Sequence, residues 1–177
     1  MDVKNIDVVQ SLSEMTWKFC LSTELWEKYL VEKHSVDLSK LIKIPYFDKD
    51  ITKLSDEVNS IPNDKGGIYL YVLENPVVPD TGRYIMYVGR ARKTKWENLR
   101  TRAKSHFAQY KRAEENSRLA RLYEKWAPYV YFMYIPLNSN EVIDQVEDEL
   151  IVALTPPCNI KYPSVKIKNK LSAFQYS

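Results

Sequence analysis

The sequence predicts a small α+β protein, with a three-stranded mixed or antiparallel sheet that is flanked by helices and preceded by a helical N-terminal extension. Two observations support this class. Segments rich in β-branched and aromatic residues, which is typical of strands, occur at 68–73, 84–88 and 129–137. Segments with helical periodicity separate or follow them, at 97–113, 116–126 and 141–154. Strands and helices in this order form layered α+β folds.

Length and composition fit one globular domain with an extension. The chain has 177 residues, of which 45% are hydrophobic and 28% are charged, so it can bury a core. Ser60–Gly67 has the chemistry of a loop, and we therefore expect a helical extension over residues 1–62 and a main domain over 63–177 that ends in a tail. The sequence shows no signal peptide and no apolar run that would span a membrane, which predicts a cytoplasmic protein.

The expected elements follow in order along the chain. The extension has mixed helical spacing over 15–33. The strand at 68–73 alternates, with Ile68, Leu70 and Val72 on one face and two tyrosines on the other. A loop over 75–83, rich in turn residues, leads to the return strand, which we expect to end at Gly89.

The second half begins with helices and continues with a strand and a helix. The helix at 97–113 carries an apolar stripe, and the helix at 116–126 is basic. The strand at 129–137 is almost entirely apolar, so we expect it in the centre of the sheet with both faces buried. The helix at 141–154 ends before Pro156 and Pro157.

Positive charge is concentrated in one part of the chain. Residues 90–125 contain 12 lysines and arginines against 4 glutamates, a balance of +8 in a chain whose net charge is +3. Such a block predicts a face that binds a polyanion, and the aromatic residues among the cations favour nucleic acid over a merely solvated surface. The candidate contacts are Arg90, Arg92, Lys93, Lys95, Lys104, Arg118 and Arg121.

Glu147 lies on the apolar stripe of the helix at 141–154, between Val146 and Leu150. A carboxylate on a core face is costly unless it is paired with or bound to a cation. Glu147 is therefore a candidate metal ligand or catalytic group.

Arg102 and His106 are four residues apart and lie together at the border of a helix's apolar stripe. An arginine there can hold a phosphate with two hydrogen bonds, and a histidine beside it can move a proton near neutral pH. Each residue alone also fits an ordinary structural role.

Five elements together resemble the GIY-YIG nuclease superfamily. Gly67-Ile68-Tyr69 and Tyr87-Val88-Gly89 resemble its paired signature, and Arg102 with His106 matches its helical arginine motif. Glu147 followed by Ile151 and Leu154, with Asn159 beyond, is similar to its metal-binding segment. The resemblance covers about 66–162 and implies a GIY-YIG-like catalytic domain within residues 63–177. Stand-alone restriction endonucleases are the members that the chain looks closest to.

The resemblance implies hydrolysis of DNA phosphodiesters with one divalent ion, Mg²⁺ or Mn²⁺, at Glu147. Arg102 would stabilise the charged phosphate, and Tyr69 would orient or deprotonate the attacking water. His106 would accept a proton from Tyr69, and Tyr87 would bond to a phosphate oxygen or to the water. Asn159 would hold either the local backbone or a site side chain.

Three functions remain open. The first is a sequence-specific, restriction-like endonuclease acting on double-stranded DNA, with a homodimer on palindromic sites and a DNA methyltransferase as possible partners. The second is a structure-specific nuclease of repair or recombination. The third is a nucleic-acid-binding module without catalysis, which would bind in a salt-sensitive manner and not cleave.

Overall fold

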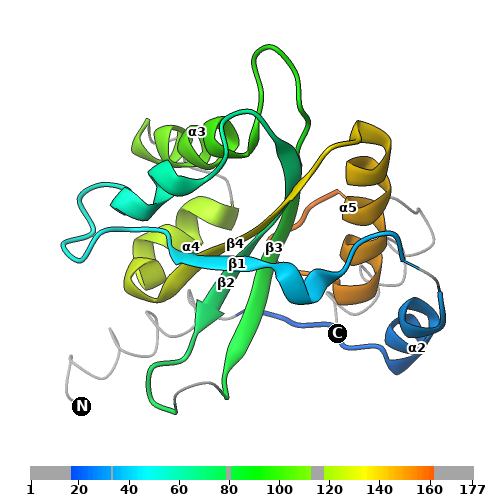
Figure 1. The fold of residues 1–177 in the computed structure, drawn as a ribbon. Coiled ribbons are helices and arrows are strands. Elements are labelled where there is room, and N and C mark those ends of the chain that lie inside the picture. Colours follow the sequence, from blue (N-terminus) through cyan, green and yellow to red (C-terminus); the bar gives the residue numbers. More distant parts are fainter. Residues whose placement is uncertain (1–16, 33, 79–80, 113–117, 162–177) are drawn as a thin grey trace, which may run out of the picture.

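A four-stranded antiparallel sheet forms the centre of the structure (Figure 1), a computed structural model that describes residues 17–32, 34–78, 81–112 and 118–161. The strands are β1 (Ile42–Pro45), β2 (Gly66–Glu74), β3 (Arg83–Ala91) and β4 (Val130–Leu137). Their order is β1-β4-β2-β3, which puts β4 and β2 inside and β3 at an edge. The predicted α+β class and the central position of 129–137 are confirmed. What the sequence predicts for residues 1–16 and for the tail after 161 lies outside the described residues.

The prediction of three strands is wrong, because residues 42–45 add β1 to the sheet. This strand pairs with β4, with Ile42 opposite Tyr134. The segment after it also enters the core, since Tyr46 and Ile61 have no exposed surface. The sequence predicts helical structure here, whereas α2 (Thr23–Val31) is the one α-helix that the structure describes before β2. Four residues ending in proline have too little alternation to predict a strand, and pairing with β4 supplies what the local sequence lacks.

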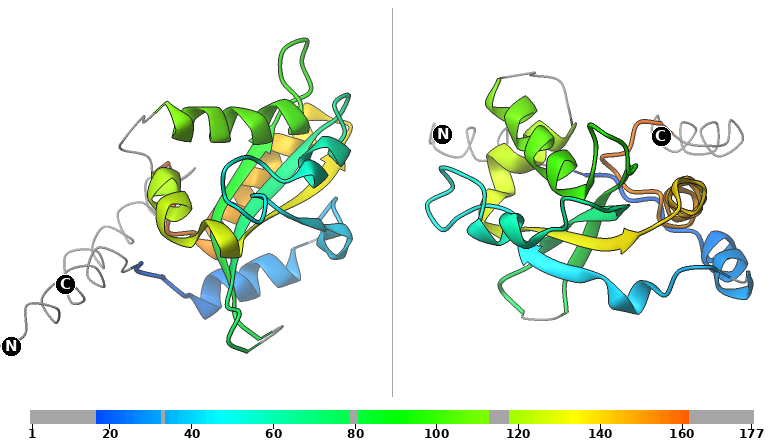
Figure 2. Two further views of the ribbon diagram at one scale, coloured as in Figure 1. Left: turned by 90° about the vertical axis from the view of Figure 1, so that its left-hand side faces the viewer. Right: turned by 45° about the horizontal axis from the view of Figure 1, so that its top comes forward.

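The predicted alternation of β2 is confirmed and divides the core into two layers. Ile68, Leu70 and Val72 pack with α5 (Asn140–Leu154) on one face of the sheet. Tyr69 and Tyr71 pack on the other face, beneath α3 (Leu99–Lys111) and α4 (Arg118–Trp126). Figure 2 shows these helices on opposite sides of the sheet. Each fully buried large apolar side chain contributes about 1.5–3 kcal/mol to this arrangement.

The helix ends follow local capping chemistry. α3 begins at Leu99, two residues after the predicted start, because the Asn98 side chain accepts a hydrogen bond from Thr101 N and caps the helix. Ser139 caps α5 in the same way, and Thr155 ends α5 in the left-handed conformation with φ of 43°. Among the described helices, none is long and apolar enough to cross a membrane.

β3 continues past Gly89 to Ala91, whereas the sequence predicts that it ends at Gly89. The glycine is required by a close approach and not by a turn. A Cβ atom on Gly89 would lie 2.5 Å from the Tyr69 hydroxyl oxygen on the neighbouring strand. Gly67 is similar, because its Cβ would lie 2.1 Å from the Ile135 carbonyl oxygen on β4. The two signature glycines therefore let side chains and backbone crowd together around Tyr69.

Candidate active site

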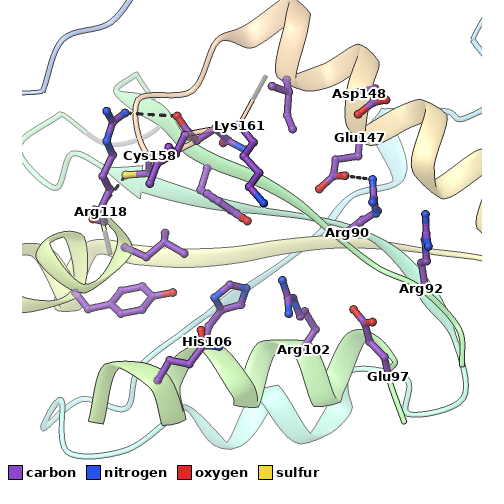
Figure 3. A pocket seen from close by; sticks show the side chains of 17 residues that line it. Arg90, Arg92, Glu97, Arg102, His106, Arg118, Glu147, Asp148, Cys158 and Lys161 are labelled. Carbon is purple, nitrogen blue, oxygen red and sulfur yellow. Dashed lines mark hydrogen bonds and ion pairs between the residues drawn. The ribbon is translucent and has the colours of Figure 1, made fainter. Parts of the chain in front are cut away.

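A pocket of about 700 Å³ opens at the β3 edge of the sheet, between α3 and α5 (Figure 3). Five of the six predicted catalytic residues line it: Tyr87, Arg102, His106, Glu147 and Asn159. The sixth, Tyr69, has no exposed surface and lies behind the wall that Arg102 and His106 form. The fold thus gathers residues that are up to 90 positions apart in the chain, counted from Tyr69 to Asn159.

One wall of the pocket is a hydrogen-bonded group built by β2 and α3. The Tyr69 hydroxyl lies 2.7 Å from His106 Nε2, and Arg102 Nε donates to the same hydroxyl at 3.3 Å. Tyr87 stacks on Tyr69 with ring centroids 6.1 Å apart. The predicted i, i+4 pairing of Arg102 with His106 therefore turns both side chains toward the sheet, where they share Tyr69.

The protonation states of this group follow from its burial. Burial and the positive charge of Arg102 lower the pKa of His106 to about 3, so its imidazole is neutral at pH 7. Burial raises the pKa of Tyr69 well above 10, and the neighbouring Tyr87 adds to that rise, so Tyr69 is a neutral phenol. The Tyr69 oxygen accepts from Arg102 Nε, and its bond to His106 Nε2 runs in either direction, as set by the tautomer of the neutral imidazole.

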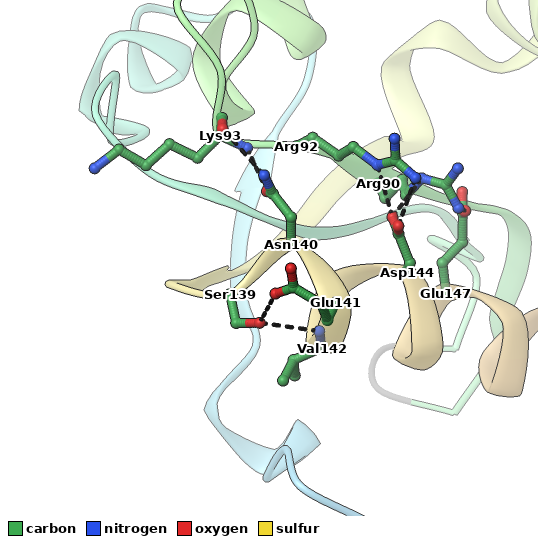
Figure 4. Close-up of polar contacts among 9 residues, drawn as sticks. All are labelled: Arg90, Arg92, Lys93, Ser139, Asn140, Glu141, Val142, Asp144 and Glu147. Carbon is green, nitrogen blue, oxygen red and sulfur yellow. Dashed lines mark hydrogen bonds and ion pairs between the residues drawn. The ribbon is translucent and has the colours of Figure 1, made fainter.

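The opposite wall is carried by α5 and centres on Glu147. Its side chain is 15% exposed and pairs with the Arg90 guanidinium of β3 (Figure 4). Burial raises the pKa of Glu147, although the charge of Arg90 opposes that rise. On this side of α5 the carboxylate is paired with a cation, and in this structure that cation is Arg90.

Two arginines predicted as nucleic-acid contacts are held by acids of α5. Arg90 Nε lies 3.1 Å from Asp144 Oδ1, in addition to its contact with Glu147. Arg92 Nε donates to the same Asp144 oxygen at 2.9 Å. Sequence reasoning missed these pairs, although Asp144 and Glu147, three residues apart, do share one helix face.

The two walls lie on opposite faces of the sheet and meet around its edge strand. Tyr87 packs with the cluster beneath α3 and α4, whereas Val88 packs with the cluster beneath α5. Arg90, two residues after Val88, reaches α5 as well. The pocket therefore wraps around β3, and a substrate in it would contact groups from both layers of the protein.

The Asn159 side chain forms hydrogen bonds with the backbone of the edge strand β3. Its Oδ1 accepts from Val88 N at 2.9 Å, and its Nδ2 donates to Val88 O at 2.8 Å. Cys158 N donates to Met86 O at 2.8 Å beside it. Of the two roles that the sequence left open for Asn159, these contacts correspond to holding the local backbone.

The remaining predicted nucleic-acid contacts differ in their surroundings. Lys93, Lys95 and Arg121 are exposed. Lys104 is also exposed, and its Nζ donates to Asn59 Oδ1 at 2.9 Å. Arg118 lines the pocket but donates to the Pro157 carbonyl at 2.7 Å, so it also anchors the segment that carries Asn159.

Lys161 and Gln109 line the pocket and were not among the predicted site residues. Lys161 follows Asn159 by two positions, and only the basic character of the tail pointed to it. Gln109 lies three residues after His106, a spacing that puts both on one side of α3.

Within the described ranges, no group of three or more His, Cys, Asp or Glu side chains converges on a common ion position. No family model matches the chain, and comparison with the curated proteins and with the solved structures found no significant match.

Proposed function

We propose that the protein is a divalent-metal-dependent endonuclease that hydrolyses DNA phosphodiester bonds, and that its sheet and helices are a GIY-YIG-like fold with one added strand. One observation carries the proposal: the half-buried carboxylate of Glu147 lines the same pocket as Arg102 and the neutral His106, and both of these bond to Tyr69 behind them. Five cationic residues line this pocket (Arg90, Arg92, Arg102, Arg118 and Lys161), against three acidic ones (Glu97, Glu147 and Asp148). The excess of positive charge suits a polyanion, while Glu147 has little use in simple phosphate binding.

Glu147 would supply one carboxylate ligand to a hard cation such as Mg²⁺ or Mn²⁺ once the Arg90 guanidinium moves off it. Mg²⁺ usually keeps several waters and binds one or two carboxylates together with substrate phosphate oxygens. Glu147 and Asp148 offer carboxylates on the pocket side of α5, and burial raises the pKa of Glu147 in a way that a nearby cation would offset. When bound, the ion would polarise the phosphate and lower the pKa of a bound water.

Arg102 would hold the scissile phosphate. Its Nε is bonded to Tyr69, which fixes the guanidinium while its terminal nitrogens remain on the pocket side of α3. A guanidinium fixed in this way stabilises the charge that develops when water adds to phosphorus and the bond to the leaving oxygen breaks. Tyr87, whose side chain lines the same pocket, would bond to a phosphate oxygen or to the attacking water.

His106 would accept at Nδ1 the proton that leaves the attacking water, in the tautomer whose Nε2–H donates to the Tyr69 oxygen. It lines the pocket in its neutral form, whereas Tyr69 has no exposed surface. Arg102 is one of the two causes that lower the pKa of His106, so a phosphate bound to Arg102 raises that pKa and makes the imidazole a better base. Tyr69 acts here as the group that orients His106 and Arg102.

The sequence-specific, restriction-like form of this activity rests on the sequence resemblance, as do a homodimer and a partner methyltransferase. Purified protein would be incubated with plasmid and phage DNA in Mg²⁺, Mn²⁺ or EDTA. Discrete metal-dependent fragments support a site-specific nuclease, and a smear supports an unspecific one. Intact DNA with salt-dependent binding contradicts this form and leads to branched substrates or a binding module.

A pair of variants on α3 makes the test specific. Arg102→Ala should slow cleavage by about 10²–10³-fold, because it removes the group that stabilises the phosphate. Lys111→Ala removes the same charge from an exposed position at the last turn of α3, outside the pocket, and should cleave like the unaltered protein. Equal rates for the two variants would contradict the proposed role of Arg102.

A further inference from the structure

Residues 92–98 form a structured loop that leads from β3 to α3 and projects beyond the sheet (Figures 1 and 2). At its base, Asn140 of α5 pairs with both backbone groups of Lys93: Lys93 N donates to Asn140 Oδ1 at 2.9 Å, and Asn140 Nδ2 donates to Lys93 O at 3.2 Å (Figure 4). At its other end, Asn98 caps α3, and Leu99 N donates to Lys65 O at 3.0 Å. The loop is therefore fixed on both sides.

The tip of this loop is a closed turn that presents a tryptophan. Thr94 N donates to Glu97 O at 3.0 Å, and Thr94 Oγ1 accepts from Trp96 N at 3.2 Å and from Glu97 N at 2.9 Å. The backbone of the turn is thus bonded within itself. The Trp96 side chain is nevertheless 79% exposed, more than any other large aromatic residue that the structure describes.

An indole held in water on an ordered turn gains no free energy from burial and leaves its ring surface available to a ligand. The surroundings indicate the partner. Lys93 and Lys95 are exposed on the same loop, and Lys95 Nζ lies 4.8 Å from the centroid of the Trp96 ring. Arg92 and Glu97, at the two ends of the turn, line the pocket. A flat aromatic ring among cations, beside a basic pocket, matches the way proteins bind bases and phosphates together.

We propose that Trp96 is a stacking platform for an unstacked base of the nucleic acid whose phosphate lies in the pocket. The inference rests on the proposed function for the identity of the ligand, and it adds how the strand is held. The lysines contact the backbone phosphates, while Trp96 stacks on a base that has left its helical position or lies in a single strand.

The test measures binding in EDTA, so that no cleavage occurs. The probes are a fluorescein-labelled mixed-sequence single strand, a duplex with a central bulge and the matching perfect duplex. Trp96→Ala should weaken binding to the single strand and to the bulged duplex by about 5- to 150-fold, the range expected for the loss of one base–aromatic stack. Trp96→Phe should retain most of the affinity, because it keeps an aromatic face.

Lys95→Ala is the matched control for charge. For this variant, the slope of log affinity against log salt concentration should become shallower by about 0.7 on single strands and about 0.9 on duplexes, because one phosphate contact disappears. Trp96→Ala should lower the affinity by the same factor at every salt concentration and leave the slope unchanged, since stacking releases no counterions. Binding of Trp96→Ala within twofold of the unaltered protein on all three probes, or a loss seen only as a change of slope, would overturn the inference.

This readout separates the inference from the proposed function. Trp96-dependent binding without any metal-dependent cleavage would contradict the nuclease proposal and leave the stacking platform standing. Metal-dependent cleavage together with unchanged DNA binding by Trp96→Ala would support the nuclease proposal and contradict the stacking platform. Because Trp96 is largely exposed, the variant should unfold at the same denaturant concentration as the unaltered protein, which shows that the comparison is between folded proteins.

Discussion

Replacing Gly89 with alanine tests how closely the site is built around Tyr69. The new Cβ would lie 2.5 Å from both Cζ and the hydroxyl oxygen of Tyr69, and 2.6 Å from Cε1 of Tyr87. Carbon atoms normally approach to about 3.5–4.0 Å, so each ring must yield by about 1 Å. Tyr69 cannot do so freely, because it has no exposed surface and stacks on Phe132 at a centroid distance of 5.2 Å.

The expected cost of Gly89→Ala has two parts. Overpacking a tight core costs about 1–3 kcal/mol of unfolding free energy. A shift of Tyr69 would also disturb its hydrogen bonds to His106 and Arg102, at 2.7 and 3.3 Å. Misplacing a catalytic group by about 1 Å can slow a reaction by about 100-fold. We therefore expect a less stable protein that also cleaves DNA about 100-fold more slowly when it is fully folded.

The assay combines denaturant unfolding with single-turnover cleavage, and Gly82→Ala is the control. A Cβ on Gly82 would lie 2.8 Å from the Asn75 Cβ atom, in the hairpin between β2 and β3 and outside the pocket. It should lower stability and leave the cleavage rate unchanged. If Gly89→Ala keeps its stability within about 0.5 kcal/mol, the range of ordinary surface substitutions, and cleaves normally, the site does not depend on the close contact with Tyr69.

The remaining predictions concern pH and the basic residues. Because the pKa of His106 is lowered to about 3 in the folded protein, His106 takes up a proton on unfolding between about pH 3 and 6.5. The free energy of unfolding should therefore fall as pH decreases through this range, by up to about 1.4 kcal/mol per pH unit. His106→Phe should reduce that pH dependence in denaturant melts. His34 behaves oppositely: its hydrogen bond to the Tyr29 carbonyl is the main cause that raises its pKa above 6.5, so its contribution is complete below pH 6.5 and is lost as pH rises through the raised value. His34→Gln should therefore destabilise the protein at pH 5.5 more than at pH 8.5, and an equal effect at both values would count against a charged imidazole. Arg118→Ala should lower the free energy of unfolding by about 1–3 kcal/mol, because it leaves buried carbonyl groups without their donor. Arg121→Ala should leave stability unchanged and flatten the salt dependence of DNA binding. The reverse pattern would show that the two roles are exchanged.

Much of the fold could be predicted because its signals are local. The alternation of Ile68, Leu70 and Val72 with two tyrosines sets the faces of β2, and the continuous apolar run of β4 indicates its central position. β1 could not be predicted in this way. Its four residues include a proline and show one buried position, Ile44, so pairing with β4 determines the strand.

The candidate site likewise combines local features that the sequence shows with long-range contacts that it does not show. The position of Glu147 on an apolar stripe and the spacing of Arg102 and His106 are helix-periodic features that the sequence displays directly. The ion pair of Arg90 with Glu147 is not such a feature, since it depends on how α5 packs across the edge of β3. The same applies to Arg118, whose hydrogen bond to the Pro157 carbonyl joins segments 39 residues apart.

Single-turnover cleavage by Glu147→Ala, with enzyme in excess and DNA fully bound, tests whether this carboxylate takes part in DNA hydrolysis. We expect metal-dependent cleavage by the unaltered protein and a rate lower by at least about 10²–10³-fold in the variant, which should still bind DNA. Glu141→Ala, an exposed glutamate in the first turn of the same helix, should cleave at the full rate. Cleavage by Glu147→Ala at the rate of the unaltered protein would show that Glu147 has no part in DNA hydrolysis.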